Sequence, residues 1–343
     1  MAELLAWIAI AMAALFATLV ATIVIRRFLA ERRRAREAKL RPPIETAVAE
    51  YLAAEEVGHP ALASGRHARE LLRTVALETM SELHGRERER LVALLERWGV
   101  VAETAAGLGS RRRRTRRAAA EALRQIGSEE ATRSLVIGLE DSDLDTALTC
   151  AAALAELPDE ERLPAIVALA DRAAVARPGA VAAILVTLGR RHPSAIGDAI
   201  APPRSLELRR LAAAVAGELR LVEHVPALHR ALAEADDELA ARAARGLGMI
   251  GDDGALDRLL ALVEQEGRPW FVRLAATEAL GAIGDPRAVG PLAEELKSDV
   301  WQLQAKAAKA LGLLGDGGEA ALRRARFSPT QAVREHARVA LER

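Results

Sequence analysis

A single segment recurs along most of this chain at almost constant spacing, and this repeat constrains the fold more than any other feature. The position of Leu280 is occupied elsewhere by Leu123, Leu154, Leu185, Ala216, Leu247, Leu311 and Leu341. Five of the steps between these residues are 31 residues long, one is 33 and one is 30. A spacing this regular is typical of a stack of similar supersecondary units, in which each unit contacts only its neighbours.

Each unit is predicted to form two antiparallel helices joined by a tight turn. The apolar residues of the first helix follow helical spacing: Ala276, Ala279 and Ile283. Gly284 suits the left-handed residue that ends a helix, whereas Asp285 and Pro286 suit the start of the next one. The buried face of the second helix would consist of Val289, Leu292 and Leu296. Only 3% of the residues are aromatic, so small side chains must let the helices approach closely.

Residues 273–289 carry the pattern Arg-x-x-Ala-x-x-Ala-Leu-x-x-Ile-Gly-Asp-Pro-x-Ala-Val. This pattern resembles the short bacterial HEAT-like repeat of about 30 residues, a class also found in phycobiliprotein lyases. The resemblance covers residues 110–343 clearly and residues 65–110 weakly. It implies an all-α fold, namely a right-handed α-solenoid of helix pairs whose second helices line a concave face. Because the motif is structural, it implies little about function.

The resemblance also implies that several charged residues belong to the framework of the repeat. One repeat position is occupied by arginines: Arg116, Arg209, Arg273 and Arg334. Another repeat position is occupied by aspartates: Asp252, Asp285 and Asp316. HEAT repeats suggest a ladder of Asp–Arg contacts between adjacent units, so we expect these residues to be structural rather than to bind a ligand.

Residues 4–25, which precede the repeat, form an uncharged and largely apolar segment. A helix of this length would extend about 33 Å, which is enough to cross a hydrocarbon core. The alternatives are a buried soluble helix, an amphipathic surface helix and a cleaved signal peptide. The segment has no polar face, and a signal peptide normally begins with positive charge, which is absent here. The segment therefore predicts a single transmembrane helix.

Basic residues follow this segment directly and predict its orientation. They include Arg26, Arg27, Arg32, Arg33, Arg34 and Arg36. Positive flanks stay in the cytoplasm, so we expect an N-terminus outside the inner (cytoplasmic) membrane and a solenoid in the cytoplasm. Pro42 and Pro43 are expected to break the helix. The predicted organisation is an external N-terminus (1–3), a transmembrane helix (4–25), a basic juxtamembrane linker (26–43), a divergent helical cap (44–109) and the HEAT-like solenoid (110–343).

The sequence shows no residue pattern typical of catalysis or of metal or cofactor binding. None of the seven histidines forms a His-x-x-x-His pair, and neither a phosphate-binding loop nor a nucleophile elbow is present. The single cysteine, Cys150, excludes a disulfide framework, and its repeat position predicts a buried, inert thiol. We therefore expect no cofactor, no metal and no small-molecule substrate.

Two surface features do not follow from the repeat. The first is a run of arginines before the first clear repeat: Arg111, Arg112, Arg113 and Arg114. Positive charge at a helix N-terminus is unfavourable, so this run is compatible with a solvated basic loop, a docking patch for an acidic protein or lipid headgroups, or a nucleic-acid site. The second feature comprises Trp270 and Trp301, which either pack between units or anchor a partner.

Together these features predict a non-enzymatic, membrane-anchored scaffold or adaptor that binds a protein partner on its concave face. A lyase-like protein or accessory subunit of a membrane-associated enzyme complex is one alternative, which convergent titratable groups in the concave groove would favour. A nucleic-acid-binding HEAT-like protein is the other. Residues 42–343 carry 40 basic and 45 acidic side chains, and this acidic balance weakens the nucleic-acid hypothesis.

Overall fold

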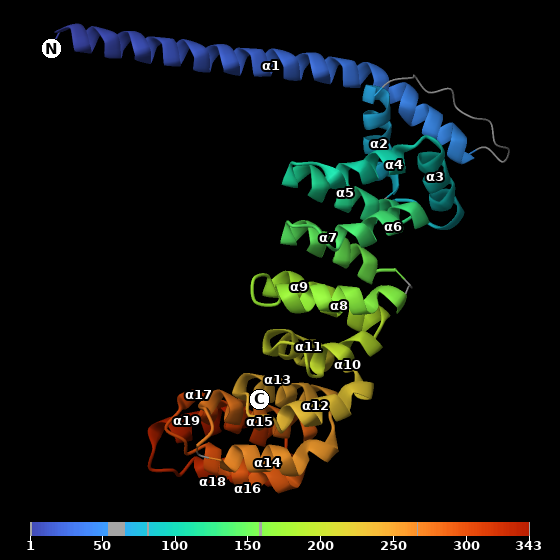
Figure 1. Ribbon diagram of the computed structural model, residues 1–343. Helices are drawn as coiled ribbons and strands as arrows, with labels where there is room; N and C mark the ends of the chain where they lie inside the picture. Colours follow the sequence, from blue (N-terminus) through green and yellow to red (C-terminus); the bar gives the residue numbers. More distant parts are fainter. Residues whose placement is uncertain (1, 54–65, 81, 158–159, 266, 343) are drawn as a thin grey trace. The chain divides into compact units, whose positions relative to one another are not determined.

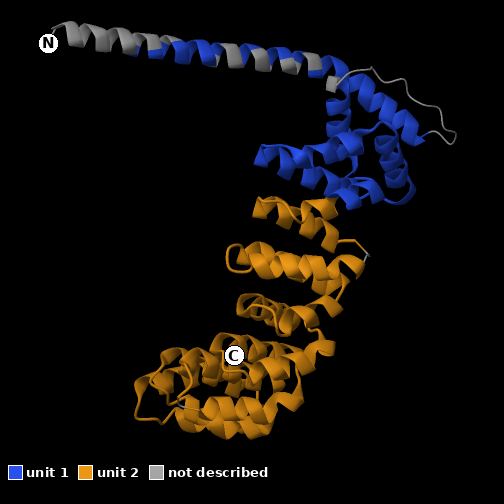
Figure 2. Cartoon of the chain, viewed as in Figure 1, with its two compact units in different colours: residues 1–134 blue, residues 135–343 orange. Residues whose placement is uncertain are grey.

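The computed structural model describes residues 2–53, 66–80, 82–157, 160–265 and 267–342. Every regular element within these ranges is a helix (Figure 1). The chain divides into two compact units, residues 1–134 and 135–343, and the division lies inside helix α6 (Glu129–Gly138) (Figure 2). The prediction of an all-α fold is thus confirmed for the described part of the chain.

Unit 1 contains the N-terminal helices and the first helix of the clear repeat. Besides the first part of α6, its elements are α1 (Ala2–Ala53), α2 (Arg66–Met80), α3 (Gly85–Arg97), α4 (Val100–Ala106), the 3₁₀ turn η1 (Gly107–Gly109) and α5 (Arg113–Ile126). Leucines from three of these helices, Leu72, Leu94 and Leu123, are almost fully buried. Helices α2, α3, α4 and α5 therefore share one hydrophobic core.

Helix α1 continues through Pro42 and Pro43, where the sequence predicted a break. Interior proline costs about 3 kcal/mol because it removes a backbone hydrogen bond. Tertiary contacts offset this cost, since Ile44 and Val48 are buried in the core of unit 1. Arg90 also donates to the carbonyl oxygen of Tyr51 at 2.6 Å, which satisfies the end of the helix. Figure 1 shows that α1 changes direction before it ends.

Within the described residues, no helix has a stretch long and apolar enough to cross a membrane. The predicted transmembrane helix over residues 4–25 is therefore not supported, and the predicted single-pass localisation in the inner membrane is wrong. Helix α1 runs without interruption past Ile25 and through the basic flank to Ala53.

The basic flank of the predicted span is part of helix α1 and makes contacts within that helix. Arg27 pairs with Glu31 at 3.1 Å, and the guanidinium of Arg32 lies 4.4 Å from the centre of the Phe28 ring. The side chains of the other flank arginines lie outside the described residues: Arg26, Arg33, Arg34 and Arg36. The predicted role of this cluster in orienting a membrane span is withdrawn with the span itself.

Unit 2 consists of helix pairs whose first and second helices form two layers (Figure 2). The first helices are α7 (Leu144–Ala155), α9 (Pro178–Arg191), α11 (Leu206–Glu218), α13 (Asp237–Ile250), α15 (Trp270–Ile283), α17 (Trp301–Gly312) and α19 (Gln331–Leu341). The second helices are α8 (Leu163–Ala173), α10 (Ser194–Ile200), α12 (Val225–Leu232), α14 (Leu256–Glu264), α16 (Val289–Glu295) and α18 (Gly315–Ala325). Short 3₁₀ turns precede four of them: η2 (Glu160–Arg162), η3 (Val222–His224), η4 (Asp253–Ala255) and η5 (Pro286–Ala288).

The repeat positions identified in the sequence have the predicted structural roles. The position of Leu280 lies on the first helix of every pair, and its side chain is fully buried in α15. Gly284 has a φ of 82° and ends α15, with its N–H donating to the carbonyl oxygen of Leu280 at 3.1 Å. Asp285 accepts a hydrogen bond from the N–H of Arg287 at 2.8 Å and thereby caps η5. The predicted two-helix unit is therefore confirmed.

Candidate functional site

A groove of about 290 Å³ crosses three consecutive first helices of unit 2, α13, α15 and α17. We call it the α13–α15–α17 groove. Its lining combines small, apolar and charged side chains: Arg245, Gly248, Met249, Glu278, Ala279, Ala282, Lys306, Lys309, Ala310 and Leu313. The groove thus lies on the first helices, whereas the sequence predicted partner contact on the second helices; that second surface stays a prediction.

Close helix packing forms the floor of this groove. A Cβ atom added to Gly248 would lie 2.5 Å from the Cα of Ala279, so α13 touches α15 with its backbone. A Cβ atom added to Gly281 would lie 2.7 Å from the Cβ of Ala310, so α15 and α17 are equally close. Small residues therefore leave a shallow floor, above which only the longer neighbouring side chains project.

Two rows of side chains follow the groove at the spacing of the repeat. Met249, Ala282 and Leu313 occupy one repeat position and form the apolar row. Met249 is 45% exposed and Leu313 is 59% exposed, although both are large apolar residues. Four residues earlier on each helix, one turn away, the charged row consists of Arg245, Glu278 and Lys309.

The charges of the groove are unequally compensated. Arg245 Nε donates to Glu278 Oε2 at 3.0 Å, and Lys306 pairs with the other oxygen of the same carboxylate. Burial alone would raise the pKa of Glu278, but the hydrogen bonds and charges of Lys306 and Arg245 outweigh burial and hold this pKa below its ordinary value. Within the described residues Lys309 forms no ion pair. The rim of the groove is therefore positive.

This groove was missed by sequence reasoning, although a signal was present. In the four preceding repeats the position of Met249 is polar: Gln125, Glu156, Thr187 and Glu218. It is apolar in the three units that line the groove, at Met249, Ala282 and Leu313, and is Arg343 in the last repeat. A local change from polar to apolar at one exposed repeat position is a signal that stacking does not require.

The two candidate aromatic anchors lie outside the groove. Trp270 and Trp301 are the first residues of α15 and α17, and they are 44% and 65% exposed. Trp270 contacts Phe271 edge to face, with ring centres 6.2 Å apart. The two tryptophans occupy one repeat position, which Leu206 also occupies at the start of α11. Their role as partner anchors stays a prediction.

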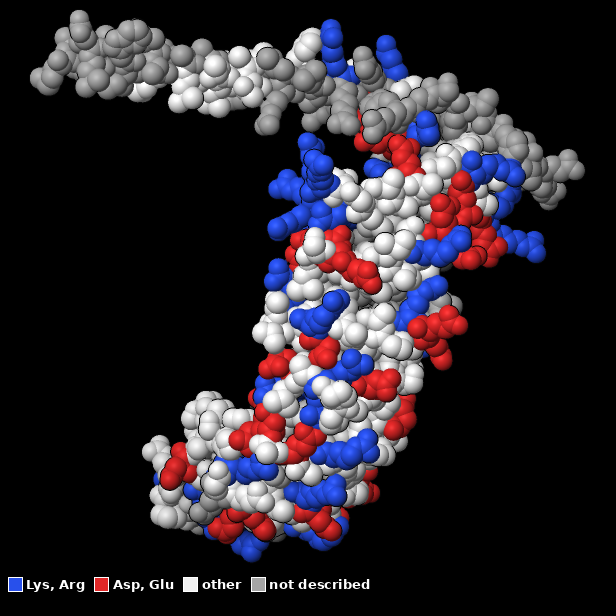
Figure 3. Space-filling view, in the orientation of Figure 1, with Lys and Arg blue, Asp and Glu red and all other residues white. Residues whose placement is uncertain are grey.

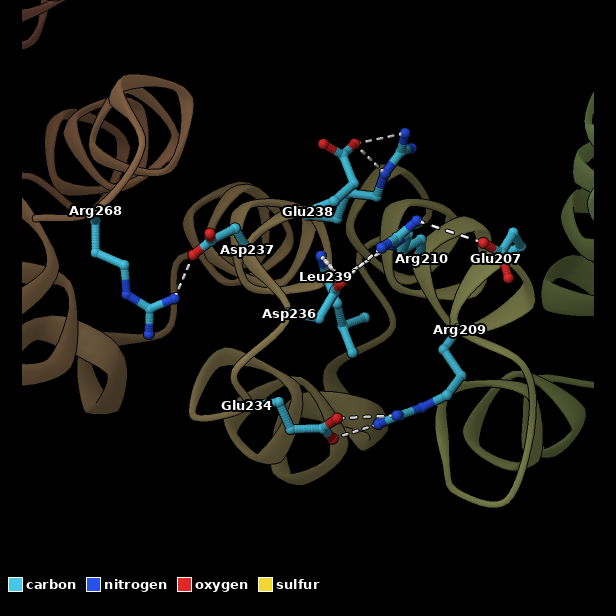
Figure 4. Close-up of polar contacts among 10 residues, drawn as sticks. Glu207, Arg209, Arg210, Glu234, Asp236, Asp237, Glu238, Leu239 and Arg268 are labelled. Carbon is cyan, nitrogen blue, oxygen red and sulfur yellow. Dashed lines mark hydrogen bonds and ion pairs between the residues drawn. The ribbon is translucent and has the colours of Figure 1, made fainter.

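Arg209 shows what the repeated arginine position does. Its side chain is buried, and its Nε donates to the carbonyl oxygen of Ile200 at 2.7 Å. The guanidinium also forms two hydrogen bonds with the carboxylate of Glu234, one of them 2.9 Å long (Figure 4). Arg209 thus joins the last residue of α10, the second helix of the preceding unit, to the segment that directly follows α12.

The other members of this repeat position make related contacts. Arg273 pairs with the buried Glu295 at 2.7 Å; burial raises the pKa of this carboxyl above its ordinary value, although Arg273 opposes that effect. At the same repeat position in three other units, the side chain donates a hydrogen bond to a backbone carbonyl of the preceding loop: Arg116 to Ser110, Gln304 to Ser298 and Arg334 to Ser328. The carboxylate partners of Arg209 and Arg273 are thus glutamates, and not the predicted aspartates.

The predicted ladder aspartates face other groups. Asp252 accepts a hydrogen bond from His229 Nε2 at 2.8 Å, and Asp285 caps a turn within its own unit. Asp316 lies in the first turn of α18, where a negative charge is favourable. Asp285 and Asp316 thus support helix ends within their own units, whereas Asp252 contacts α12 of the preceding unit; these contacts differ from the predicted Asp–Arg ladder.

Other ion pairs do connect neighbouring units. Arg210 binds both carboxylate oxygens of Asp236, and Arg268 pairs with Asp237 (Figure 4). The hydrogen bond from Arg210 holds the pKa of Asp236 below its ordinary value, against the opposing effect of burial, and the N–H of Leu239 assists. Asp236 therefore caps α13 and binds α11 at the same time, so this charged cluster has a structural role.

The predicted arginine patch lies at the start of α5 in unit 1. Arg111, Arg112, Arg113 and Arg114 are all exposed. Figure 3 shows a dense group of Lys and Arg side chains at one end of this helix. The N–H of Arg112 is bonded to Ser110 Oγ at 3.2 Å, but its side chain does not cap the helix. The patch is thus on the surface, and its role as a docking patch stays a prediction.

Residues with possible chemical reactivity have structural roles elsewhere in the described chain. His192 Nε2 and His224 Nε2 donate to the carbonyl oxygens of Leu157 and Pro193, at 2.7 and 2.6 Å. Both rings are buried and connect consecutive units. Within the described residues, no group of three or more His, Cys, Asp or Glu side chains is placed to hold a metal ion.

Cys150 is fully buried in α7, as predicted from its repeat position. Burial, assisted by the charge of Asp141, raises the pKa of its thiol to about 12. We expect the native chain to react with a disulfide reagent at least 100-fold more slowly than the urea-unfolded chain at about pH 8, because only the thiolate is nucleophilic. Absorbance of the released thiol measures this; equal rates would show that the helix pair opens readily.

Comparison with known proteins agrees with this architecture. Residues 225–312 match the family model described as HEAT repeats, and residues 115–141 match the model described as PBS lyase HEAT-like repeat. The chain therefore contains HEAT-like repeats, and the first of these matches includes every lining residue of the α13–α15–α17 groove except Leu313. No curated protein matches the chain in sequence.

Several solved structures are similar in fold at low sequence identity. Kap121p bound to Ste12p is 12% identical with a TM-score of 0.52, over 92% of this chain and 42% of that one. Kap121p bound to RanGTP is 14% identical with a TM-score of 0.52, over 87% and 40%. Human deoxyhypusine hydroxylase is 19% identical with a TM-score of 0.30, over 71% and 94%. This chain thus spans about two fifths of the Kap121p chains that it matches, and the similarity extends to the solenoid fold alone.

Proposed function

We propose that this chain is a non-enzymatic scaffold that binds an acidic amphipathic helix of a protein partner in the α13–α15–α17 groove. The observation that carries the proposal is the exposed apolar row, whose ends are Met249 and Leu313. Beside this row lies Lys309, a cation for which the described residues show no ion pair. Exposed apolar side chains that form a patch with a polar or charged rim are typical of protein interaction surfaces. The positive rim favours a partner whose helix is acidic on both sides of its apolar stripe.

The dimensions of the apolar row suit a helix. Neighbouring packed helices lie about 8 to 10 Å apart, so Met249 and Leu313, two units apart, span about 20 Å. A helix rises 1.5 Å per residue, so positions i, i+7 and i+14 recur at about 10.5 Å and can follow the row. A partner helix of about 15 residues, with apolar residues at this spacing, would therefore contact all three first helices.

The fold supports this proposal in a general way. The structures of Kap121p bound to Ste12p and bound to RanGTP concern solenoids of similar architecture in complex with other proteins. A solenoid offers an extended surface without a closed pocket, which suits the binding of protein segments. In the groove, the only carboxylate in the lining, Glu278, is neutralised by two cations, so it does not repel an acidic partner.

Binding of a designed peptide tests the proposal. The probe is a fluorescein-labelled helix with leucine at every seventh position and glutamates beside the leucines, measured by fluorescence polarisation against the whole chain. We expect saturable binding, and we expect Leu313→Glu to weaken it at least tenfold, because a charge then meets the apolar stripe. Lys309→Glu should weaken it several-fold and reduce its dependence on salt.

Two controls make the result specific. Val222→Glu changes a residue that is 64% exposed but does not line the groove, and it should leave binding unchanged. A peptide in which lysines replace the glutamates should bind at least tenfold more weakly. Equal binding of both peptides, or loss of binding in the Val222 variant to the same extent as in Leu313→Glu, would contradict the proposal.

A further inference from the structure

Unit 1 contains a larger cavity, which is independent of the groove proposed above. It has a volume of about 670 Å³ and lies between α2, α4 and α5. Its charged lining consists of Arg69 and Arg73 from α2, Arg114 from α5, and the carboxylates of Glu70 and Glu103. Small-molecule sites typically measure about 300 to 1,000 Å³, so this cavity can accommodate a ligand of nucleotide size.

The three arginines of the cavity come from two different helices. Arg69 and Arg73 are four residues apart on α2 and therefore project from the same face of that helix. Arg114 approaches from the first turn of α5. Within the described residues, the structure shows no ion pair for Arg69, Arg73 or Arg114. All three guanidinium groups line the same cavity, where like charges repel one another, and a bound anion would reduce that repulsion.

The start of α5 adds a second reason to expect an anion. A helix N-terminus carries partial positive charge and free N–H groups, and arginines are unfavourable there. Arg112 is the N-cap residue, and its side chain provides no cap. Arg111 and Arg112, which precede Arg114 in the chain, are also exposed. The helix end and the arginines therefore both favour negative charge at the mouth of this cavity.

We propose that this cavity binds a small ligand carrying two or more linked phosphates. A guanidinium offers paired N–H donors that match two phosphate oxygens, and arginines from two helices can hold adjacent phosphates together. A ligand with a single carboxylate has only two acceptor oxygens, which are too few to bind all three guanidinium groups. Glu70 and Glu103 also line the cavity, and a carboxylate disfavours a phosphate that approaches it.

Space beside the cavity suits the remainder of such a ligand. A second hollow of about 390 Å³ continues along α2 and α5, and it shares Arg73 and Ala118 with the first. Apart from Arg73, its lining is neutral or already paired: Glu78 in this hollow is bound to Arg41. The polyphosphate would thus occupy the first cavity, and an uncharged group would extend into the second.

Calorimetric titration of the whole chain with inorganic tripolyphosphate tests this inference, with citrate as an anion of similar charge. We expect one site per chain with micromolar affinity for tripolyphosphate, and at least tenfold weaker binding of citrate. Equal affinity for the two anions would show a general basic surface and overturn the phosphate assignment. A phosphoserine peptide that binds more tightly than tripolyphosphate would show a protein ligand and also overturn the inference.

Charge-neutral variants locate the site within the basic region. Arg73→Gln and Arg114→Gln should each weaken tripolyphosphate binding at least tenfold, whereas Glu103→Gln should tighten it several-fold because one repelling carboxylate is removed. Arg111→Gln is the matched control, since Arg111 belongs to the same exposed run but does not line the cavity; its effect should stay below twofold. A loss in Arg111→Gln equal to that in Arg73→Gln would refute the cavity as the site, provided that circular dichroism shows all variants folded.

Discussion

Replacement of Gly217 by valine is expected to lower the free energy of unfolding by about 3 kcal/mol, among the largest effects of any single substitution in unit 2. A Cβ atom on Gly217 would lie 2.5 Å from the Cα of Gly246, so α11 and α13 touch through their backbones. The neighbouring atom is backbone and cannot rotate away, so the two helices must separate. Urea titration monitored by helical circular dichroism measures the loss.

Gly290 provides the matched control for this substitution. It lies in the first turn of α16, it is exposed, and a Cβ atom there meets no atom within 4 Å. Gly290→Val should therefore change the free energy of unfolding by less than about 1 kcal/mol, because only helix propensity is altered. If both variants lose the same stability, the close approach of α11 and α13 does not contribute to the stack.

The same close packing determines the shape of the candidate site. Glycine and alanine at the contacts of α13, α15 and α17 bring three first helices together, and the groove is the shallow surface that remains above them. The closely packed helices leave no room for larger side chains between them. Met249 and Leu313 therefore stand above the floor of the groove and are exposed. Residues that bring these helices together, such as Gly248, Ala279 and Ala310, therefore also form the floor of the groove.

The repeat could be predicted from the sequence because it imposes the same burial on one position in every unit. Leu280 and Cys150 were assigned to the packed face on spacing alone, and both are fully buried. The ends of the first helices follow from local chemistry, as at Gly284. At the corresponding position Arg220 adopts a φ of 53°, so the turn is kept there even without glycine.

The arginine contacts could not be predicted, because they depend on loops of unequal length. Glu234 lies 25 residues after Arg209, whereas Glu295 lies only 22 residues after Arg273. A search at a fixed repeat interval therefore finds no common partner. The aspartates do share one repeat position, and the resemblance to HEAT repeats led to the wrong pairing.

The N-terminal helix was misjudged for a different reason. The interpretation of residues 4–25 considered the hydropathy of one segment and assumed that Pro42 and Pro43 would end the helix. The structure instead has a single helix to Ala53, which buried contacts of Ile44 and Val48 anchor to unit 1. The cavity of unit 1 also escaped prediction, because it joins Arg73 to Arg114 from helices that no motif connects.

Replacement of Arg209 by methionine is expected to lower the free energy of unfolding by about 3 kcal/mol. Loss of one partner of a buried ion pair typically costs 3 to 5 kcal/mol, and the lower end applies here because the side chain of Glu234 is 33% exposed. The variant also leaves the carbonyl oxygen of Ile200 without its donor. Arg323→Met, which removes an exposed pair with Glu319 in α18, should cost less than about 0.5 kcal/mol.

A double-mutant cycle separates the ion pair from the packing of the arginine stem. Glu234→Gln alone should cost about 1 kcal/mol, because the amide oxygen can still accept one hydrogen bond from Arg209. If the pair acts as a unit, the combined variant should be about as stable as Arg209→Met alone, with a coupling energy of about 1 kcal/mol or more. Strictly additive losses would show that Arg209 acts through Ile200 and its own burial, and that Glu234 is only a neighbour.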